Sequence, residues 1–280
     1  MFKTAGLIAR LDMKEALTLA SNLAEYLENR GLAVHFEYEL AEKIGKTAKG
    51  IKLEEMKPDF LITIGGDGTI LRACLSLPKP EPPILPVNMG VRGFLAEVTP
   101  ENAKEAVDKI LEGKFRLKKY SKLASFIGKE RLPDALNEVF VSADTPVKLF
   151  HAKVWKNHAL VAECRADGLM VATQVGSTGY SLSAGGPVLD PDIDAFVLTP
   201  VCPLTIFNSV VFSAKTSLTI EILKPENALI VIDGHFRRLV DAGTRLTITR
   251  SENETRFIRF EENFYQRLKN RLFFAQGGGG

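Results

Sequence analysis

The stretch from Phe60 to Leu77, FLITIGGDGTILRACLSL, constrains the fold more than any other part of the sequence. Five consecutive apolar or β-branched residues, Phe60 to Ile64, are bounded by Pro-Asp and Gly-Gly, which predicts a short buried strand. Apolar residues then recur at helical spacing, at Ile70, Leu71, Cys74 and Leu75. The turn at 65–69 therefore joins the carboxyl end of a strand to the amino end of a helix, where an open α/β sheet binds its ligands.

The residue types of this turn, GGDGT, suit phosphate chemistry. Its three glycines allow a close approach of the backbone, and free amides at a helix start attract an anion. Asp67 would be repelled by a bound phosphate, so it fits a base or a ligand of metal-bound water better. An ordinary Asp-Gly turn is the alternative. The position of the GGDGT segment directly after a buried strand favours a ligand loop. We expect ligand contacts from Gly65, Gly66, Gly68 and Thr69.

The GGDGT loop resembles the signature shared by NAD kinases, by diacylglycerol and sphingosine lipid kinases and, more distantly, by phosphofructokinases. Alone, it does not choose among these families. The pattern GxxxxGK[ST] is absent from the sequence, so the loop is not a Walker A motif.

Composition excludes several classes of function. The chain of 280 residues carries 36 basic and 34 acidic side chains, a balance that gives no reason to expect nucleic acid or a membrane as partner. Its three cysteines are widely spaced and form no CxxC pair, which suits a reducing compartment better than disulfides. The most apolar segment, 195–207, contains two prolines and is too short to span a bilayer. We therefore expect a cytoplasmic protein.

The pattern of predicted elements divides the chain into domains. Residues 1–115 alternate strands with helices, which predicts a Rossmann-like α/β domain with strands at 5–9, 33–38, 60–64 and 84–87 and helices at 12–29 and 99–111. Residues 116–260 read as short alternating runs, which predicts a β-sandwich-like domain. A last helix at 261–276 would pack back on the first domain, and 277–280 is a glycine tail.

Two further segments carry polar patterns of functional interest. Asn137 and Glu138 interrupt a β run and could hold the adjacent hydroxyls of a ribose, although an exposed polar pair would look the same. Residues 165–187, RADGLMVATQVGSTGYSLSAGGP, combine glycines, hydroxyls and one tyrosine. Such a run suits an adenosine and its phosphates through hydrogen bonds and stacking.

Taken in order, GGDGT, Asn-Glu, DG followed by GSTGYSLSAGGP, and then Asp-Gly-His at 233–235 closely resemble an NAD kinase. The GSTGYSLSAGGP block is the more specific motif. The resemblance implies an α/β domain followed by a β-rich domain, a homodimer or homotetramer, and phosphoryl transfer from ATP or polyphosphate to the adenosine 2′-hydroxyl of NAD. It also implies help from Mg²⁺ or another divalent metal ion, held through the donor phosphates.

The resemblance also implies roles for single residues. Asp67 would accept the proton of the 2′-hydroxyl, and Arg72 would approach a phosphate unless it is a solvated helix residue. Asn137 and Glu138 would contact ribose, and Arg165 and Asp167 the nicotinamide end. His235 stands where the family often has glutamine. Contacts on the adenine side would come from Val175, Thr178, Gly179, Tyr180, Ser181, Leu182 and Ser183.

Two other functions remain open on the sequence. A lipid kinase would share the GGDGT loop and should carry a membrane-facing amphipathic helix, which the sequence does not suggest. A non-catalytic sensor of NAD or NADP would keep the GSTGYS block but show no turnover.

Overall fold

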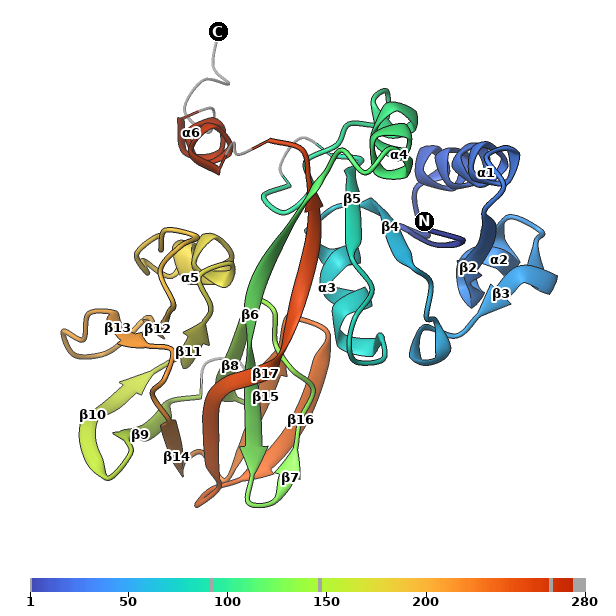
Figure 1. Cartoon of the computed structure of the whole chain (residues 1–280). Helices are drawn as coiled ribbons and strands as arrows, with labels where there is room; N and C mark the ends of the chain where they lie inside the picture. Colours follow the sequence, from blue (N-terminus) through green and yellow to red (C-terminus); the bar gives the residue numbers. More distant parts are fainter. Residues whose placement is uncertain (1, 91–92, 146–147, 262–263, 274–280) are drawn as a thin grey trace, which may run out of the picture. The chain divides into compact units, whose positions relative to one another are not determined.

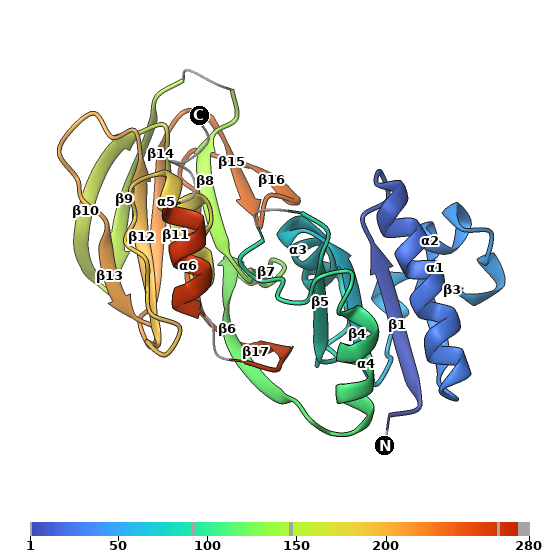
Figure 2. The same ribbon diagram turned by 90° about the horizontal axis from the view of Figure 1, so that it is seen from above.

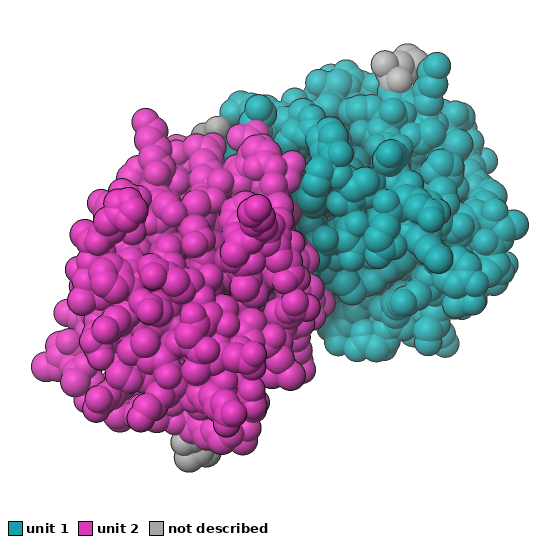
Figure 3. All heavy atoms as spheres, turned by 90° about the horizontal axis from the view of Figure 1, so that it is seen from below, with its two compact units in different colours: residues 1–119, 255–280 teal, residues 120–254 magenta. Residues whose placement is uncertain are grey.

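The computed structural model describes residues 2–90, 93–145, 148–261 and 264–273. The chain forms two compact units, which Figure 3 distinguishes by colour. Unit 1 comprises residues 1–119 and 255–280, and unit 2 comprises residues 120–254. None of the helices within the described ranges has the length and apolarity that crossing a bilayer requires.

Unit 1 is built on a parallel sheet whose strands are β1 (Thr4–Ala9), β2 (Ala33–Glu37), β3 (Gly50–Ile51), β4 (Phe60–Gly65) and β5 (Ile84–Asn88). Their order in the sheet is β3-β2-β1-β4-β5. The helices are α1 (Lys14–Asn29), α2 (Tyr38–Lys43), α3 (Asp67–Ser76), α4 (Ala103–Leu111) and α6 (Phe264–Phe273). Two short 3₁₀ turns, η1 (Thr47–Lys49) and η2 (Leu53–Glu55), flank β3.

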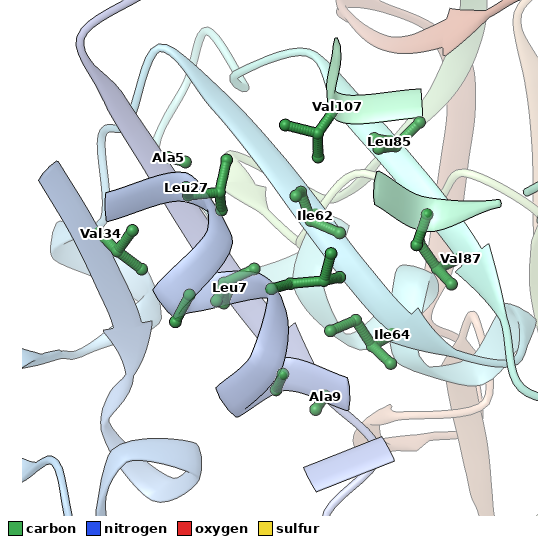
Figure 4. Close-up of a cluster of buried hydrophobic side chains, with 14 of the residues drawn as sticks. Ala5, Leu7, Ala9, Leu27, Val34, Ile62, Ile64, Leu85, Val87 and Val107 are labelled. Carbon is green, nitrogen blue, oxygen red and sulfur yellow. The ribbon is translucent and has the colours of Figure 1, made fainter. Parts of the chain in front are cut away.

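One face of this sheet packs against α1 and α4 (Figures 2 and 4). Side chains alternate along a strand, so every second residue of β1 and β4 reaches the same core. The buried cluster includes Ala5, Leu7, Ala9, Leu27, Val34, Ile62, Ile64, Leu85, Val87 and Val107. Burying this apolar stripe stabilises α1, which ends at Asn29 with Gly31 in the left-handed region (φ 82°).

Two helix starts differ from the prediction. The first helix begins at Lys14, because the carboxylate of Asp12 accepts hydrogen bonds from the side chain of Arg10 and does not cap the helix. Helix α4, predicted at 99–111, begins at Ala103, because Thr99 and Pro100 form a turn. The carbonyls of Thr99 and Pro100 accept the amides of Asn102 and Ala103. Residues 274–276 of the predicted last helix, and the glycine tail, lie outside the described residues.

Unit 2 consists mainly of antiparallel strands. One sheet has the order β13-β12-β11-β8-β15-β16, and a second group of strands, β10, β9 and β14, pairs in that order with β17. The bounds are β8 (Glu138–Ala143), β9 (Phe150–Lys156), β10 (Ala159–Ala166), β11 (Gly168–Ala172), β12 (Ala195–Val201), β13 (Val210–Ser213), β14 (Leu218–Lys224), β15 (Asn227–Ile232) and β16 (Phe236–Asp241). The 3₁₀ turn η3 (Gly176–Thr178) and the short helix α5 (Tyr180–Ser183) follow β11.

Two long strands belong to both units. They are β6 (Arg116–Ile127), which pairs with the two-residue strand β7 (Glu130–Arg131), and β17 (Arg245–Arg259). Residues 245–248 of β17 pair with β14 in unit 2, and Phe257 pairs in parallel with Ile84 of β5 in unit 1. The architecture confirms the predicted fold class, an α/β domain together with a β-sandwich-like domain.

Candidate functional site

The GGDGT loop lies at the point where the strand order of the parallel sheet reverses. The chain runs outward from β1 to β3 on one side and from β4 to β5 on the other. At this point the carboxyl ends of β1 and β4 are neighbours, and the amide of Arg10 donates to the carbonyl of Ile64 at 2.8 Å. The loop connects β4 to α3, with Gly66 as the residue before the helix. Open α/β sheets bind ligands at this kind of crevice.

The glycines of the loop meet different surroundings. A Cβ atom on Gly65 would lie 2.3 Å from Oγ1 of Thr69, so close packing inside the chain requires glycine there. A Cβ atom on Gly66 or on Gly68 would have no neighbour within 4 Å, and neither residue has a positive φ. Packing of the chain itself therefore does not explain these two glycines. A ligand that approaches the backbone closely would explain them.

The carboxylate of Asp67 is held by two backbone amides. Its Oδ2 accepts a hydrogen bond of 2.9 Å from Phe94, and its Oδ1 accepts one of 3.1 Å from Leu95. Both donors belong to the segment 89–95, which follows the neighbouring strand β5 and which we call the second loop. A carboxylate has about four acceptor positions, so two amides fix its orientation and leave other positions for a ligand.

The second loop is tied to the first by backbone contacts as well. The amide of Met89 donates to the carbonyl of Gly65 at 3.0 Å. Within the second loop, the side-chain Oδ1 of Asn88 accepts the amide of Gly90 at 3.0 Å. Val91 and Arg92 of this loop lie outside the described residues. The donors Phe94 and Leu95 were not predicted as site residues, because a backbone amide carries no side-chain signature.

Arg72 turns away from the amides of the loop. Its guanidinium binds the carboxylate of Glu37 through two nitrogens, with 2.9 Å between Nη2 and Oε2, and Nη2 lies 3.4 Å from the carbonyl oxygen of Ala9. Glu37 is 3% exposed, so this is a largely buried ion pair that joins α3 to the end of β2. The predicted contact of Arg72 with a phosphate stays a prediction.

In unit 2, Asp233 holds the segment that contains Asn137 and Glu138. Its carboxylate accepts three backbone amides, those of Leu136 at 2.7 Å, Asn137 at 2.8 Å and Glu138 at 3.0 Å. Asp233 follows β15 and adopts a left-handed conformation, with φ 49°. Its side chain was not among the predicted contacts, although the Asp-Gly pair signals the turn.

The carboxyl group of Glu138 is buried and keeps its proton at neutral pH. Burial, together with the nearby charge of Asp233, raises the pKa of Glu138 to about 8. Burial also raises the pKa of Asp233, while its three amide donors lower it. The three amides and the ammonium group of buried Lys122 favour the charged form of Asp233, whereas the pKa of Glu138 is raised both by burial and by the charge of Asp233.

Unsatisfied polar atoms mark the same place. The buried side-chain atoms of the described residues that have no hydrogen-bond partner include Oδ1 of Asn137 and Oε2 of Glu138, on adjacent residues of this segment. A buried polar atom without a partner is costly, and groups of them call for a ligand or a bound water. The segment therefore offers both acceptors and, through protonated Glu138, a donor.

The GSTGYS block packs directly on this segment. A Cβ atom on Gly176 would lie 2.0 Å from the carbonyl oxygen of Asn137, and one on Gly179 would lie 3.3 Å from Nδ2 of Asn137 and 3.5 Å from Oε2 of Glu138. Oγ1 of Thr173 donates to the carbonyl of Leu136 at 2.6 Å. Within unit 2, the structure therefore brings together two segments that are about 40 residues apart in the sequence.

The hydroxyls of the block are mostly engaged within the protein. Oγ1 of Thr178 donates to the carbonyl of Val175 at 2.9 Å, and Oγ of Ser181 lies 2.9 Å from Oγ1 of Thr199. Tyr180 differs, since it is 45% exposed and its ring meets the ring of Phe140 edge-on, with 5.5 Å between centroids. Its exposed ring could stack on a base.

The remaining predicted residues vary in position. Arg165 and Asp167 are exposed, at the end of β10 and just beyond it. Nδ1 of His235 lies 2.7 Å from the carbonyl oxygen of Asp233. Leu182 is half-buried and Ser183 is exposed.

Comparisons with known proteins cover almost the whole chain. The family model described as the ATP-NAD kinase N-terminal domain matches residues 5–115, and the one described as the ATP-NAD kinase C-terminal domain matches residues 136–260. The NAD kinase of Methanothermobacter thermautotrophicus is 37% identical over 276 residues, which cover 98% of this chain and 96% of that protein. The NAD kinase of Pyrococcus abyssi is 38% identical over 271 residues, which cover 95% and 98%.

Solved structures agree with these matches. The crystal structure of an NAD kinase from Archaeoglobus fulgidus in complex with ATP has a TM-score of 0.78 and 28% identity, and the match covers 96% of this chain and 98% of that one. Yeast NADH kinase complexed with NADH has a TM-score of 0.89 at 20% identity, over 100% of this chain and 89% of that one, which shows a shared fold. The resemblance drawn from the motifs is thereby confirmed: the chain belongs to the NAD kinase family, whose members phosphorylate NAD.

Proposed function

We propose that Asp67 accepts the proton of the adenosine 2′-hydroxyl of NAD while this hydroxyl attacks the terminal phosphorus of ATP. The observation that carries the proposal is the carboxylate of Asp67, oriented by two backbone amides at the start of a helix. A positioned base typically accelerates such a step by about 10² to 10⁴. The bond from the phosphorus to the leaving oxygen of ADP breaks as the new bond to the ribose oxygen forms, and the products are NADP and ADP.

The amides of the GGDGT loop are the proposed site of the donor phosphates. The open space above Gly66 and Gly68 allows phosphate oxygens to reach the backbone, and the amino end of α3 favours negative charge. Phosphoryl transfer depends mainly on positioning and on neutralising charge. We therefore assign this role to Gly66 and Gly68, and Gly65 and Thr69 remain proposed contacts, since the amide of Thr69 donates to the carbonyl of Gly66 at 3.0 Å.

We assign the ribose contacts to Asn137 and Glu138. The unpartnered oxygens of these two residues match the hydroxyls of a sugar, which both donate and accept. The protonated carboxyl of Glu138 can donate to one hydroxyl, and Oδ1 of Asn137 can accept from another. Tyr180 is the proposed stacking partner of the adenine, and Arg165, Asp167 and His235 remain proposed contacts.

A divalent metal ion is proposed on chemical grounds. The described residues contain no group of three or more His, Cys, Asp or Glu side chains arranged to hold a metal. Mg²⁺ usually binds through substrate phosphates together with one or two protein carboxylates. The carboxylate of Asp67, next to the proposed phosphate site at Gly66 and Gly68, fits this mode. When bound, the ion neutralises charge on the donor phosphates.

Turnover of NAD tests the function. The protein is incubated with NAD, MgCl₂ and either ATP or polyphosphate, and NADP is measured with an NADP-specific dehydrogenase. NADP formation with ATP is expected. A protein that binds NAD without any turnover would be a sensor, and phosphorylation of diacylglycerol in vesicles in place of NAD would indicate a lipid kinase. The same assay with NADH shows whether the reduced dinucleotide is accepted.

Self-association and location are also proposed. The resemblance implies a homodimer or homotetramer, and the apolar side chains of Leu204 and Ile206, 68% and 98% exposed, are the kind of surface that an oligomer covers. Analytical ultracentrifugation measures the subunit number. All three cysteines are free thiols, which supports a cytoplasmic location.

A further inference from the structure

The carboxylate of Asp67 is connected to Arg259, on strand β17, through Leu95. Leu95 uses both of its backbone groups in this connection. Its amide donates to Oδ1 of Asp67 at 3.1 Å, and its carbonyl accepts a hydrogen bond of 2.8 Å from Nη2 of Arg259, at the end of β17. Arg259 therefore holds the residue whose amide orients Asp67.

Arg259 is itself fixed in place. The side chain is 7% exposed, and its Nη1 lies 3.3 Å from Oε2 of Glu97, which is 9% exposed. The same carboxylate oxygen lies 3.3 Å from Nη1 of Arg267 on α6. The guanidinium of Arg259 also lies over the ring of Phe257, 4.9 Å from its centroid. The contact with Glu97 is an ion pair without hydrogen-bond geometry, and Nε and Nη1 have no hydrogen-bond partner among the described residues. Burial, this ion pair and the ring limit the movement of the guanidinium, so its Nη2 can fix the carbonyl of Leu95.

The other amide that binds Asp67 is supported from the same part of the chain. Phe94 donates to Oδ2 of Asp67, and its ring packs edge-on against the ring of Phe264 on α6, with 5.2 Å between centroids. Both residues that orient the carboxylate are thus held by the carboxyl-terminal segment of unit 1. The described contacts of Asp67 within unit 1 therefore depend on residues almost 200 positions further along the chain.

We propose that Arg259 is a positioning residue for phosphoryl transfer, acting through Leu95 to keep the carboxylate of Asp67 in its proton-accepting orientation. The proposal rests on the proposed role of Asp67. A displacement of about 1 Å in a reacting group can cost about a hundredfold in rate. Loss of the Arg259 contact should therefore lower kcat roughly ten- to hundredfold and change KM for NAD little, because none of the assigned ligand contacts is removed.

Arg256 provides a matched control on the same strand. Its Nη2 donates to the carbonyl of Glu81 at 2.7 Å, a bond of the same type as that from Arg259 to Leu95. Glu81 itself binds Lys79 and Thr255, whereas the amides that bind Asp67 belong to Phe94 and Leu95. We expect Arg259→Gln to lower kcat, and Arg256→Gln to leave kcat within about twofold although it removes an equivalent charge and hydrogen bond.

Amide hydrogen exchange supplies a readout besides activity. A peptide that covers residues 93–98 contains the amides of Phe94 and Leu95. Its exchange should become faster in Arg259→Gln and in Asp67→Asn, and should stay unchanged in Arg256→Gln. Unchanged exchange in Arg259→Gln would overturn the proposal, whatever the role of Asp67 in the reaction.

A double-mutant cycle separates positioning from general damage to the fold. If Arg259 acts through Asp67, then Arg259→Gln should lower kcat in the wild-type background and cause no further loss in Asp67→Asn. An equal fold-loss in both backgrounds would overturn the proposal. If Asp67→Asn keeps full activity, the proposed base fails instead, and faster exchange in Arg259→Gln would then show only a structural contact.

Arg259→Lys covers the case in which Arg259→Gln does not fold. Lysine keeps the charge near Glu97 but cannot bind both the carboxylate and the carbonyl with a planar fork. We expect kcat between that of wild type and a tenfold loss, with KM for NAD unchanged and faster exchange of residues 93–98. Wild-type kcat together with faster exchange would overturn the proposal.

Discussion

The carboxylate of Asp233 accepts a hydrogen bond of 3.0 Å from the backbone amide of Glu138, whose own carboxyl group is buried beside it. Two acidic groups are thus placed together where water is excluded. Three amides stabilise the charge on Asp233, and the pKa of Glu138 rises to about 8 because of burial and of that charge. The carboxyl group of Glu138 is therefore protonated at neutral pH, at the place where the ribose is proposed to bind.

This proton makes stability depend on pH. In the unfolded chain, Glu138 ionises near its ordinary value of 4.5, whereas in the folded protein it ionises near pH 8. Between these two values the folded state binds one more proton than the unfolded state, so stability falls as pH rises, by at most about 1.4 kcal/mol per unit. In Glu138→Gln this contribution is absent. We expect the variant to gain thermal stability relative to wild type from pH 5.5 to pH 8, measured by calorimetry. Parallel curves for the two proteins would contradict the assignment of the proton.

Replacing Asp67 by asparagine should separate chemistry from binding. The amide cannot accept the proton of the 2′-hydroxyl, so kcat should fall by about 10² to 10⁴. Affinity for NAD, measured by calorimetry, should stay within a small factor. Asp12→Asn is the control, since Asp12 is an exposed aspartate that contacts Arg10. A parallel loss of NAD affinity in Asp67→Asn would mean that the residue holds the ligand and performs no chemistry.

Alanine at two glycines of the loop should affect different properties, stability at Gly65 and ATP binding at Gly68. Gly65→Ala places a Cβ atom 2.3 Å from Oγ1 of Thr69, so the midpoint of thermal unfolding should fall. Gly68→Ala meets no atom within 4 Å and lies in helix α3 without a positive φ, so stability should be unchanged or slightly higher, while KM for ATP should rise if phosphates approach this backbone. Gly68→Ala with an unchanged KM would argue against the proposed phosphate site.

Replacing Arg72 tests whether it binds phosphate or stabilises the fold. Arg72→Met leaves the carboxylate of Glu37 buried without its partner, which should lower the free energy of unfolding by about 3 kcal/mol. The double variant Arg72→Met/Glu37→Met should recover most of this loss in chemical denaturation. If Arg72 instead binds a phosphate, the single variant would keep its stability and raise KM for ATP more than tenfold.

The sequence predicted much of the fold because its elements have regular patterns. The buried strand at 60–64, its glycine turn and the following helix are found as β4 and α3. The strand Ala195–Val201 was not predicted, since this segment was noted only as apolar, proline-containing and too short for a membrane span; β12 pairs on both sides, and Pro200 lies opposite Leu169. The sequence also predicts two separate strands, at 245–250 and 255–260, whereas the structure has one continuous strand, β17, through both. In both cases tertiary pairing overrides the local preference.

The site was predictable only where side chains carry the signal. Asp67, Asn137 and Glu138 stand in recognisable motifs. Backbone amides leave no signature in the sequence, because every residue except proline has an amide N–H. This applies to the amides of Phe94 and Leu95 and to the three amides that bind Asp233. Arg72 shows the converse, since its spacing from the loop suggested a phosphate ligand and only the structure reveals Glu37 as its partner.

The strand β17 also determines the order in which the protein can be completed during synthesis. A ribosome makes residues 1–119 of unit 1 first, but the strand segment 255–259, which pairs with β5, is made only after all of unit 2. The β-rich unit can therefore finish folding while the nascent α/β unit still lacks an edge strand and, with it, the guanidinium of Arg259. The GGDGT loop therefore gains its full set of supports only after the β-rich unit has been synthesised.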